Sequence, residues 1–211
     1  MQASGSLYLI HGAALDAGAV KFDFEKGFPF VSGIVAPIYI DTRKLWFDPA
    51  IREKAVNALA EYIDQERLEF DTIAGVESGA IAPAALLASK LQKRFVYVKK
   101  KAKEHGLKRM IECGDVEGSN VLLLEDLVST GGSSVNGIEV LRSAGAIVHD
   151  CLAVHSYDFG MATENFSKAD VRLHPLVLVG EIAHEAAVRS VISLPEEERV
   201  VAWLKNPHQP W

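Results

Sequence analysis

Short apolar runs alternate with amphipathic stretches along most of the chain, and each apolar run has the length of a buried strand. The strand candidates are Ile73–Val76, Phe95–Val98, Val121–Leu124, Ile147–Val154 and Leu176–Val179. Helical periodicity separates most of them, notably over Ile81–Leu91 and Ser134–Ala144. Strands that alternate with helices favour a mainly parallel sheet with helices on both faces, so we predict an α/β fold.

Two further helices are predicted from their start signals. Asp48 and Pro49 have the residue types of an N-cap and a first helical position, and Ile51 begins an apolar repeat at every fourth residue. Near the C-terminus, a helix is expected to start at about Pro195-Glu196 and to carry Trp203 in the packing.

The first 45 residues do not follow this alternation. A short N-terminal helix is expected to lead into Val20–Phe24, and the Gly- and Pro-containing stretch after it ends in the apolar run Ile38–Ile40. We interpret the segment after the helix as a small hood over the ligand site. The predicted organisation is a helix and hood over residues 1–45 and a core over residues 46–211, within one structural domain overall.

The most specific motif is Val121–Ser133, VLLLEDLVSTGGS, which we interpret as strand, loop and helix start. A Gly-, Ser- and Thr-rich turn at a helix N-terminus can hold a phosphate through backbone N–H groups and hydroxyls. The carboxylates Glu125 and Asp126 repel phosphate, so they suit sugar hydroxyls or a magnesium shell. The pattern fits a ribose 5-phosphate and lacks the P-loop and dinucleotide fingerprints. An ordinary strand-to-helix turn with hydroxyl caps is the alternative.

Composition narrows the classes of function. The chain has 211 residues and a net charge of −6, which argues against a nucleic-acid surface. Cys113 and Cys151 have no metal or redox spacing and suit a reducing cytosol. No apolar run approaches the roughly 20 residues that span a bilayer, and no basic segment suggests a signal peptide. We therefore expect a cytoplasmic globular protein with no membrane or nucleic-acid partner.

A basic cluster follows the strand candidate Phe95–Val98. Six of the 22 Lys and Arg residues fall within positions 99–109, together with His105. The stretch 99–119 lacks strong hydrophobic periodicity, and a long connection of this kind is typical of a mobile lid or binding loop. A solvated run of charges is the alternative.

The motif VLLLEDLVSTGGS resembles the phosphoribosyl-pyrophosphate (PRPP) motif of type I phosphoribosyltransferases, in the form typical of orotate phosphoribosyltransferases. The resemblance implies that Glu125 and Asp126 hold the ribose hydroxyls and that the turn cradles the 5-phosphate. The PRPP-binding residues implied by the motif are Glu125, Asp126, Leu127, Val128, Ser129, Thr130, Gly131, Gly132 and Ser133.

The basic segment YVKKKAKEHG resembles the catalytic loop of the same family. The implied catalytic residues are Lys103, His105, Lys99 and Lys100, and Lys99, Lys103 and His105 also count as PRPP ligands. In the family this loop closes over the pyrophosphate of a neighbouring subunit, which implies a homodimer with a shared active site. Mobile cations there would neutralise the departing pyrophosphate.

Two other segments extend the resemblance. SGIVAPIYIDTR, from Ser32 to Arg43, resembles the hood signature, so Tyr39 is a candidate to stack on the base; Ser129 is the second orotate-binding candidate. Glu77, Ser78 and Gly79 resemble the pyrophosphate loop, with Ala80 in place of its second glycine. The segment His155–Phe159 replaces an arginine-containing segment of some members, so the partner of the orotate carboxylate is not identified.

The resemblance implies the fold of the type I phosphoribosyltransferases and the transfer of ribose 5-phosphate from PRPP to orotate. The products would be orotidine 5′-phosphate and pyrophosphate, in pyrimidine biosynthesis. Mg²⁺ is the implied cofactor, held mainly through PRPP, so we assign no residue as a metal ligand. Two alternatives stay open: a phosphoribosyltransferase for another base, and a regulator that senses PRPP without turning it over.

Overall fold

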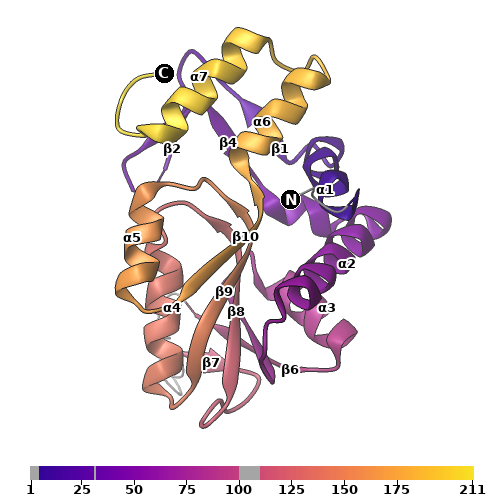
Figure 1. Ribbon diagram of the computed structural model, residues 1–211, viewed down its shortest axis with the longest axis vertical. Coiled ribbons are helices and arrows are strands. Elements are labelled where there is room, and N and C mark those ends of the chain that lie inside the picture. The colour runs from indigo at the N-terminus through magenta and orange to yellow at the C-terminus, as the bar shows by residue number, and fades with distance from the viewer. Residues whose placement is uncertain (1–4, 31, 100–109) are drawn as a thin grey trace.

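The computed structural model describes residues 5–30, 32–99 and 110–211, and its centre is a six-stranded sheet (Figure 1). The strand order is β10-β9-β8-β5-β6-β7. All neighbouring pairs are parallel except β6 and β7, which are antiparallel. The strands are β5 (Thr72–Val76), β6 (Arg94–Val98), β7 (Ile111–Glu112), β8 (Asn120–Val128), β9 (Ile147–Ser156) and β10 (Arg172–Leu178).

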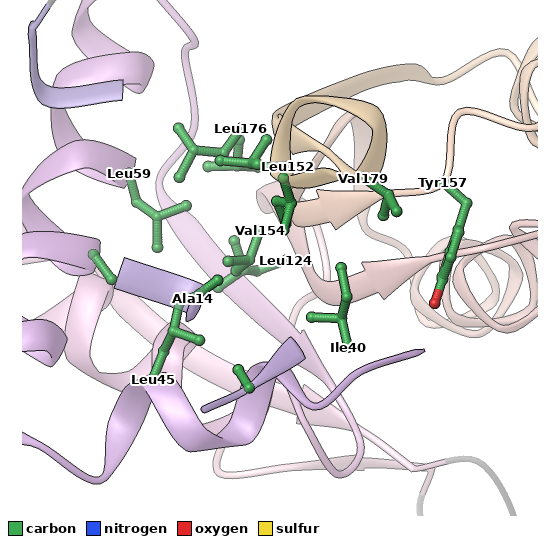
Figure 2. Packing of buried hydrophobic residues seen from close by; sticks show 14 of the residues in the cluster. Ala14, Ile40, Leu45, Leu59, Leu124, Leu152, Val154, Tyr157, Leu176 and Val179 are labelled. Carbon is green, nitrogen blue, oxygen red and sulfur yellow. The ribbon is translucent and has the colours of Figure 1, made fainter. Parts of the chain in front are cut away.

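Helices cover both faces of this sheet. On one side lie α1 (Gly5–Asp16), α2 (Pro49–Glu66) and α3 (Ile81–Leu91), and on the other lie α4 (Gly132–Ser143) and α5 (Gly160–Lys168) (Figure 1). Each side has its own apolar cluster. Leu59 of α2 shares one cluster with Leu124 and Leu152, whereas Ile138 of α4 shares the other with Leu123 (Figure 2 shows part of the first cluster). The predicted α/β sheet with two covered faces is confirmed.

The hood consists of two small antiparallel sheets. β1 (Val20–Phe22) pairs with β4 (Ile38–Ile40), and β2 (Phe28–Pro29) pairs with β3 (Val35–Ala36). The hood lies at one end of the molecule together with α6 (Val179–Val188) and α7 (Leu194–Lys205) (Figure 1). A 3₁₀ helix, Thr42–Trp46, connects it to α2.

The C-terminal tail fastens the hood. Nε1 of Trp211 donates a hydrogen bond to the carbonyl of Phe24 at 3.3 Å, and Nη2 of Arg199 donates to the same carbonyl at 3.1 Å. The Arg199 guanidinium also lies 5.1 Å from the centre of the Phe24 ring. Two residues of the C-terminal region therefore hold the hood segment at Phe24.

The predicted helix starts follow from capping. The Asp48 carboxylate accepts hydrogen bonds from the backbone N–H groups of Ala50 and Ile51 at 2.9 and 3.0 Å, and Pro49 is the first residue of α2. α7 begins at Leu194, where Ser193 and Glu196 form a capping box. The prediction near Pro195-Glu196 was therefore one residue late.

Several boundaries differ from the prediction. β8 continues through both acids to Val128, because its pairing with β9 persists as far as Ser156. Val179 begins α6 and does not end β10. β7 and the buried Val116 lie in the predicted loop of residues 99–119, whereas residues 100–109 of that loop lie outside the described part of the chain. The division of the chain at residue 45 stays a prediction. No helix in the described ranges combines the length and apolar character needed to cross a bilayer.

Candidate active site

A cavity of about 700 Å³ lies where the carboxyl ends of β5 and β8 meet the hood. Ligands of open parallel sheets bind at this edge. The predicted site residues Glu125, Asp126, Leu127, Ser129, Thr130, Ser133, Ser78, Gly79 and Tyr39 line this cavity, and so do Phe30, Arg43 and Tyr157. The sheet thus brings together segments that lie far apart in the sequence.

The two acids occupy adjacent positions near the end of β8 with different surroundings. Glu125 is only 3% exposed, and its Oε1 accepts a hydrogen bond from Oγ of Ser133 at 3.3 Å. Asp126 is half-buried and lies against Gly79 of the turn after β5. Two carboxylates at one cavity wall can accept hydrogen bonds from neighbouring hydroxyl groups.

The turn after β5 approaches β8 closely. A Cβ on Gly79 would lie 1.7 Å from Oδ2 of Asp126, so a side chain at this position would have to displace the Asp126 carboxylate. The peptide bond between Glu77 and Ser78 is cis, a feature that the sequence pattern did not reveal. Ala80 has a φ of −88°, which any L-residue adopts, so alanine is compatible with the place of the family's second glycine.

The turn between β8 and α4 has the geometry of an anion-binding site. Gly131 is the N-cap of α4 with a φ of 79°, and as a glycine it offers no side-chain cap to the first N–H groups of this helix. A Cβ on Gly131 would also lie 3.0 Å from the ring of Phe166. Nδ2 of Asn165 donates to the Thr130 carbonyl at 2.9 Å and fixes the turn. The first N–H groups of α4, at the positive end of the helix dipole, can therefore bind an anion.

Not every residue of the motif has its side chain in the cavity. Val128 is 1% exposed within the apolar core, and its carbonyl accepts a hydrogen bond from the Tyr157 N–H at 2.9 Å. Gly132 is the first residue of α4 and offers only backbone groups. These two positions shape the turn.

Lys99 is the part of the basic segment that the structure describes. Its side chain is 5% exposed, and Nζ forms an ion pair with Glu112 of β7. Lys99 lines a neighbouring cavity of about 190 Å³ with Ser133, and not the 700 Å³ cavity. The predicted residues Lys100, Lys103 and His105 lie outside the described residues.

Aromatic rings form the hood side of the cavity. Tyr39 lies 5.6 Å from Phe28, and Phe30 packs edge-on at 5.2 Å against Tyr157, measured between ring centroids. The Tyr157 hydroxyl donates to the Ile38 carbonyl at 3.1 Å, and burial raises the pKa of this phenol. A planar ring could therefore enter between aromatic neighbours.

Sequence reasoning missed Phe30, Arg43 and Tyr157. Nε of Arg43 donates to Oδ1 of Asp41 at 2.7 Å, and this hydrogen bond lowers the pKa of Asp41. The hood signature from Ser32 to Arg43 was the available signal for Arg43, because it ends on that residue. Within the described residues, no group of three or more His, Cys, Asp or Glu side chains could hold a metal ion by itself.

Comparisons with known proteins place the chain in a family. Residues 48–174 match the model of the phosphoribosyl transferase domain. The chain is 38% identical over 199 residues to an orotate phosphoribosyltransferase of Porphyromonas gingivalis, covering 94% of this chain and 95% of that protein. It is 34% identical over 193 residues to the orotate phosphoribosyltransferase of Coxiella burnetii, covering 92% of each.

Solved structures agree with this placement. A structure of Leishmania donovani UMP synthase has a TM-score of 0.80 at 28% identity, covering 95% of this chain and 42% of that chain. An orotate phosphoribosyltransferase from Aeropyrum pernix has a TM-score of 0.74 at 28% identity, covering 85% of this chain and 98% of that chain. The chain therefore belongs to the phosphoribosyl transferase family, within its group of orotate phosphoribosyltransferases.

Proposed function

We propose that the protein transfers ribose 5-phosphate from PRPP to orotate and releases orotidine 5′-phosphate and pyrophosphate. One observation carries the proposal. Glu125 and Asp126 lie in a single cavity between an uncapped helix N-terminus and an aromatic hood. This cavity offers hydroxyl acceptors, a phosphate site and a surface for a planar base, which are the three recognition elements that the two substrates need.

The sugar and phosphate half of the substrate would lie on the core. Glu125 and Asp126 would accept hydrogen bonds from the ribose 2- and 3-hydroxyls. The turn from Ser129 to Ser133 would bind the 5-phosphate through backbone N–H groups and hydroxyls. The backbone at Glu77–Gly79 would contact the diphosphate, which the missing Cβ of Gly79 permits.

Catalysis of this reaction depends mainly on the pyrophosphate leaving group. The bond from C1 of the ribose to the pyrophosphate oxygen breaks, a bond from C1 to N1 of orotate forms, and the N1 proton leaves to the pyrophosphate or to solvent. The ribose gains oxocarbenium character as the first bond breaks, so catalysis depends chiefly on stabilising the charge that gathers on pyrophosphate. We propose that Lys100, Lys103 and His105 supply this stabilisation from a second copy of the chain. The ion pair of Lys99 with Glu112 fixes the residue that precedes Lys100 in the chain.

Magnesium fits this site as an ion bound mainly by the substrate. The cavity offers Asp126 as a partly accessible carboxylate, and the described residues provide no larger cluster of acids or histidines. Mg²⁺ would therefore take most of its oxygen ligands from PRPP and would neutralise charge on the pyrophosphate. Tyr39 and Ser129 would contact the base. We propose a cytoplasmic homodimer that acts in pyrimidine biosynthesis.

A spectrophotometric assay tests the function. Purified protein with PRPP and Mg²⁺ should deplete the absorbance of orotate, and pyrophosphate should appear in equal amount. Omitting PRPP or adding EDTA should abolish both changes. Faster turnover of another base in a panel would make the protein a phosphoribosyltransferase for that base. Binding of PRPP without release of pyrophosphate would instead indicate a regulator.

A further inference from the structure

The charged side chains that line the cavity include more acidic than basic groups. Among the described lining residues, Asp41, Glu125 and Asp126 carry negative charge, and Arg43 is the one basic side chain. A base substrate that is itself an anion would meet repulsion from three carboxylates in a partly desolvated cavity. Such a substrate needs a cation at its own end of the cavity.

The guanidinium of Arg43 can bind a carboxylate through its two terminal nitrogens. Its Nε donates to Oδ1 of Asp41 at 2.7 Å, whereas Nη1 and Nη2 form no hydrogen bond with any described residue. The side chain is 61% exposed, so the two terminal nitrogens are accessible. A guanidinium held through Nε presents its outer fork in a fixed orientation, and this fork matches the two oxygens of a carboxylate.

The backbone around Arg43 is held on both sides. Thr42 is 2% exposed, and its Oγ1 is 2.9 Å from Nδ1 of the buried His155 at the end of β9. Nζ of Lys44 donates to the Gly18 carbonyl at 2.8 Å. These contacts join the 3₁₀ helix that follows the hood to the core, so Arg43 has a defined place at the cavity wall.

The position of Arg43 also matches the chemistry of the base. The carboxylate of orotate is on C6, the carbon next to the N1 atom that bonds to the ribose. Its partner must therefore lie close to both the base and the sugar. Arg43 lines the same cavity as Tyr39, the base candidate, and Asp126, the sugar candidate. Its side chain is therefore in the cavity that would hold both parts of the nucleotide.

We propose that Arg43 binds the carboxylate of the base substrate and thereby selects orotate over bases without a carboxylate. The inference rests on the proposed function and adds a residue to it. Asp41 orients the guanidinium, and the hydrogen bond between Thr42 and His155 fixes the backbone beneath it.

Two nucleotides that differ only in the carboxylate test the proposal. Isothermal titration calorimetry of the full-length protein with Mg²⁺ should give dissociation constants for orotidine 5′-phosphate and uridine 5′-phosphate. The unchanged protein should prefer orotidine 5′-phosphate. Arg43→Gln should weaken orotidine 5′-phosphate about 10- to 100-fold, the range expected for charge-assisted hydrogen bonds, and should leave uridine 5′-phosphate within about threefold.

A matched control is available in Arg94. This arginine is 60% exposed and pairs with Asp71, as Arg43 does with Asp41. It is the first residue of β6, so it lies at the amino ends of the parallel strands, whereas the cavity lies at their carboxyl ends. Arg94→Gln should leave both affinities unchanged. Arg43→Lys keeps the charge without the fork and should retain part of the preference. If thermal melting shows that Arg43→Gln is unfolded, the affinity ratio of the two nucleotides for Arg43→Lys tests the proposal instead.

Three outcomes overturn the proposal. If the affinity ratio of the two nucleotides is unchanged in folded Arg43→Gln and Arg43→Lys, the carboxylate is bound elsewhere. If both nucleotides weaken equally, Arg43 acts on the sugar or phosphate. If the unchanged protein neither consumes orotate nor binds orotidine 5′-phosphate, the proposed function itself fails, and this result is distinct from the other two.

Discussion

His155→Phe should make the stability of the protein less sensitive to mild acid. His155 is fully buried at the end of β9, and Nδ1 lies 2.9 Å from Oγ1 of Thr42. Burial, with a smaller contribution from the nearby His11, lowers the pKa of His155 from 6.5 to about 3. His11 itself pairs with Glu181 of α6 at 3.4 Å.

The sign and size of the effect follow from linkage. Between pH 6.5 and about 3 the unfolded chain binds a proton at His155 and the folded protein does not, so stability is present above pH 6.5 and is lost as pH falls. One pKa unit corresponds to about 1.4 kcal/mol, which gives on the order of 5 kcal/mol over the whole range and roughly 2 kcal/mol by pH 5. A loss of 2 kcal/mol is a large fraction of a typical stability of about 5–15 kcal/mol.

Urea unfolding at about pH 7.5 and about pH 5 measures this effect. The unchanged protein should lose roughly 2 kcal/mol more between the two pH values than His155→Phe does. The exposed His149 on the same strand β9 provides the control, because His149→Gln should keep the full sensitivity. The absolute stability of His155→Phe will also fall, since the buried Thr42 hydroxyl loses its partner. An equal pH dependence in unchanged protein and His155→Phe would refute the assignment of a neutral, buried His155.

Two further substitutions test the binding of PRPP and the release of pyrophosphate. Gly79→Ala should lower kcat/KM for PRPP by at least about 10²-fold in a folded protein, because the new Cβ displaces Asp126; Gly160→Ala, with open space around its Cβ, should have no effect. A normal kcat/KM in Gly79→Ala would contradict the role of this close approach. Lys103→Ala should lower kcat by about 10²–10³, the cost of removing one transition-state donor, and steady-state kinetics that show unchanged turnover would eliminate Lys103 from catalysis.

The sequence predicted the sheet and the central motif because both are local patterns. Buried parallel strands are short apolar runs, and the helix starts at Asp48 and Ser193 follow from side chains that bond to nearby N–H groups. The end of β8 was not predictable in this way. Glu125 and Asp126 interrupt the apolar run, yet the strand continues because its backbone still pairs with β9. The pattern of apolar and polar side chains does not report the backbone hydrogen bonds between two strands.

The start of α6 shows the opposite error. The run from Leu176 to Val179 has the composition of a strand, but Val179 begins a helix whose third residue, Glu181, accepts the Leu178 N–H at 2.8 Å. Apolar residues continue across the boundary because β10 and α6 are both buried. Hydrophobic periodicity over so short a run cannot separate a strand from a helix start.

The contacts that join the hood to the core separate the residues that select the base from those that bind PRPP. Residues proposed for the sugar and phosphate lie on β5, β8 and their turns, whereas Tyr39 lies on the hood and Arg43 on the 3₁₀ helix that follows it. The two parts meet through side chains of β9 and its following loop, His155 with Thr42 and Tyr157 with Ile38. Hood substitutions can therefore change the base that is accepted while the PRPP half keeps its geometry, provided that these two hydrogen bonds survive. Base selectivity and PRPP affinity should then vary independently among hood variants.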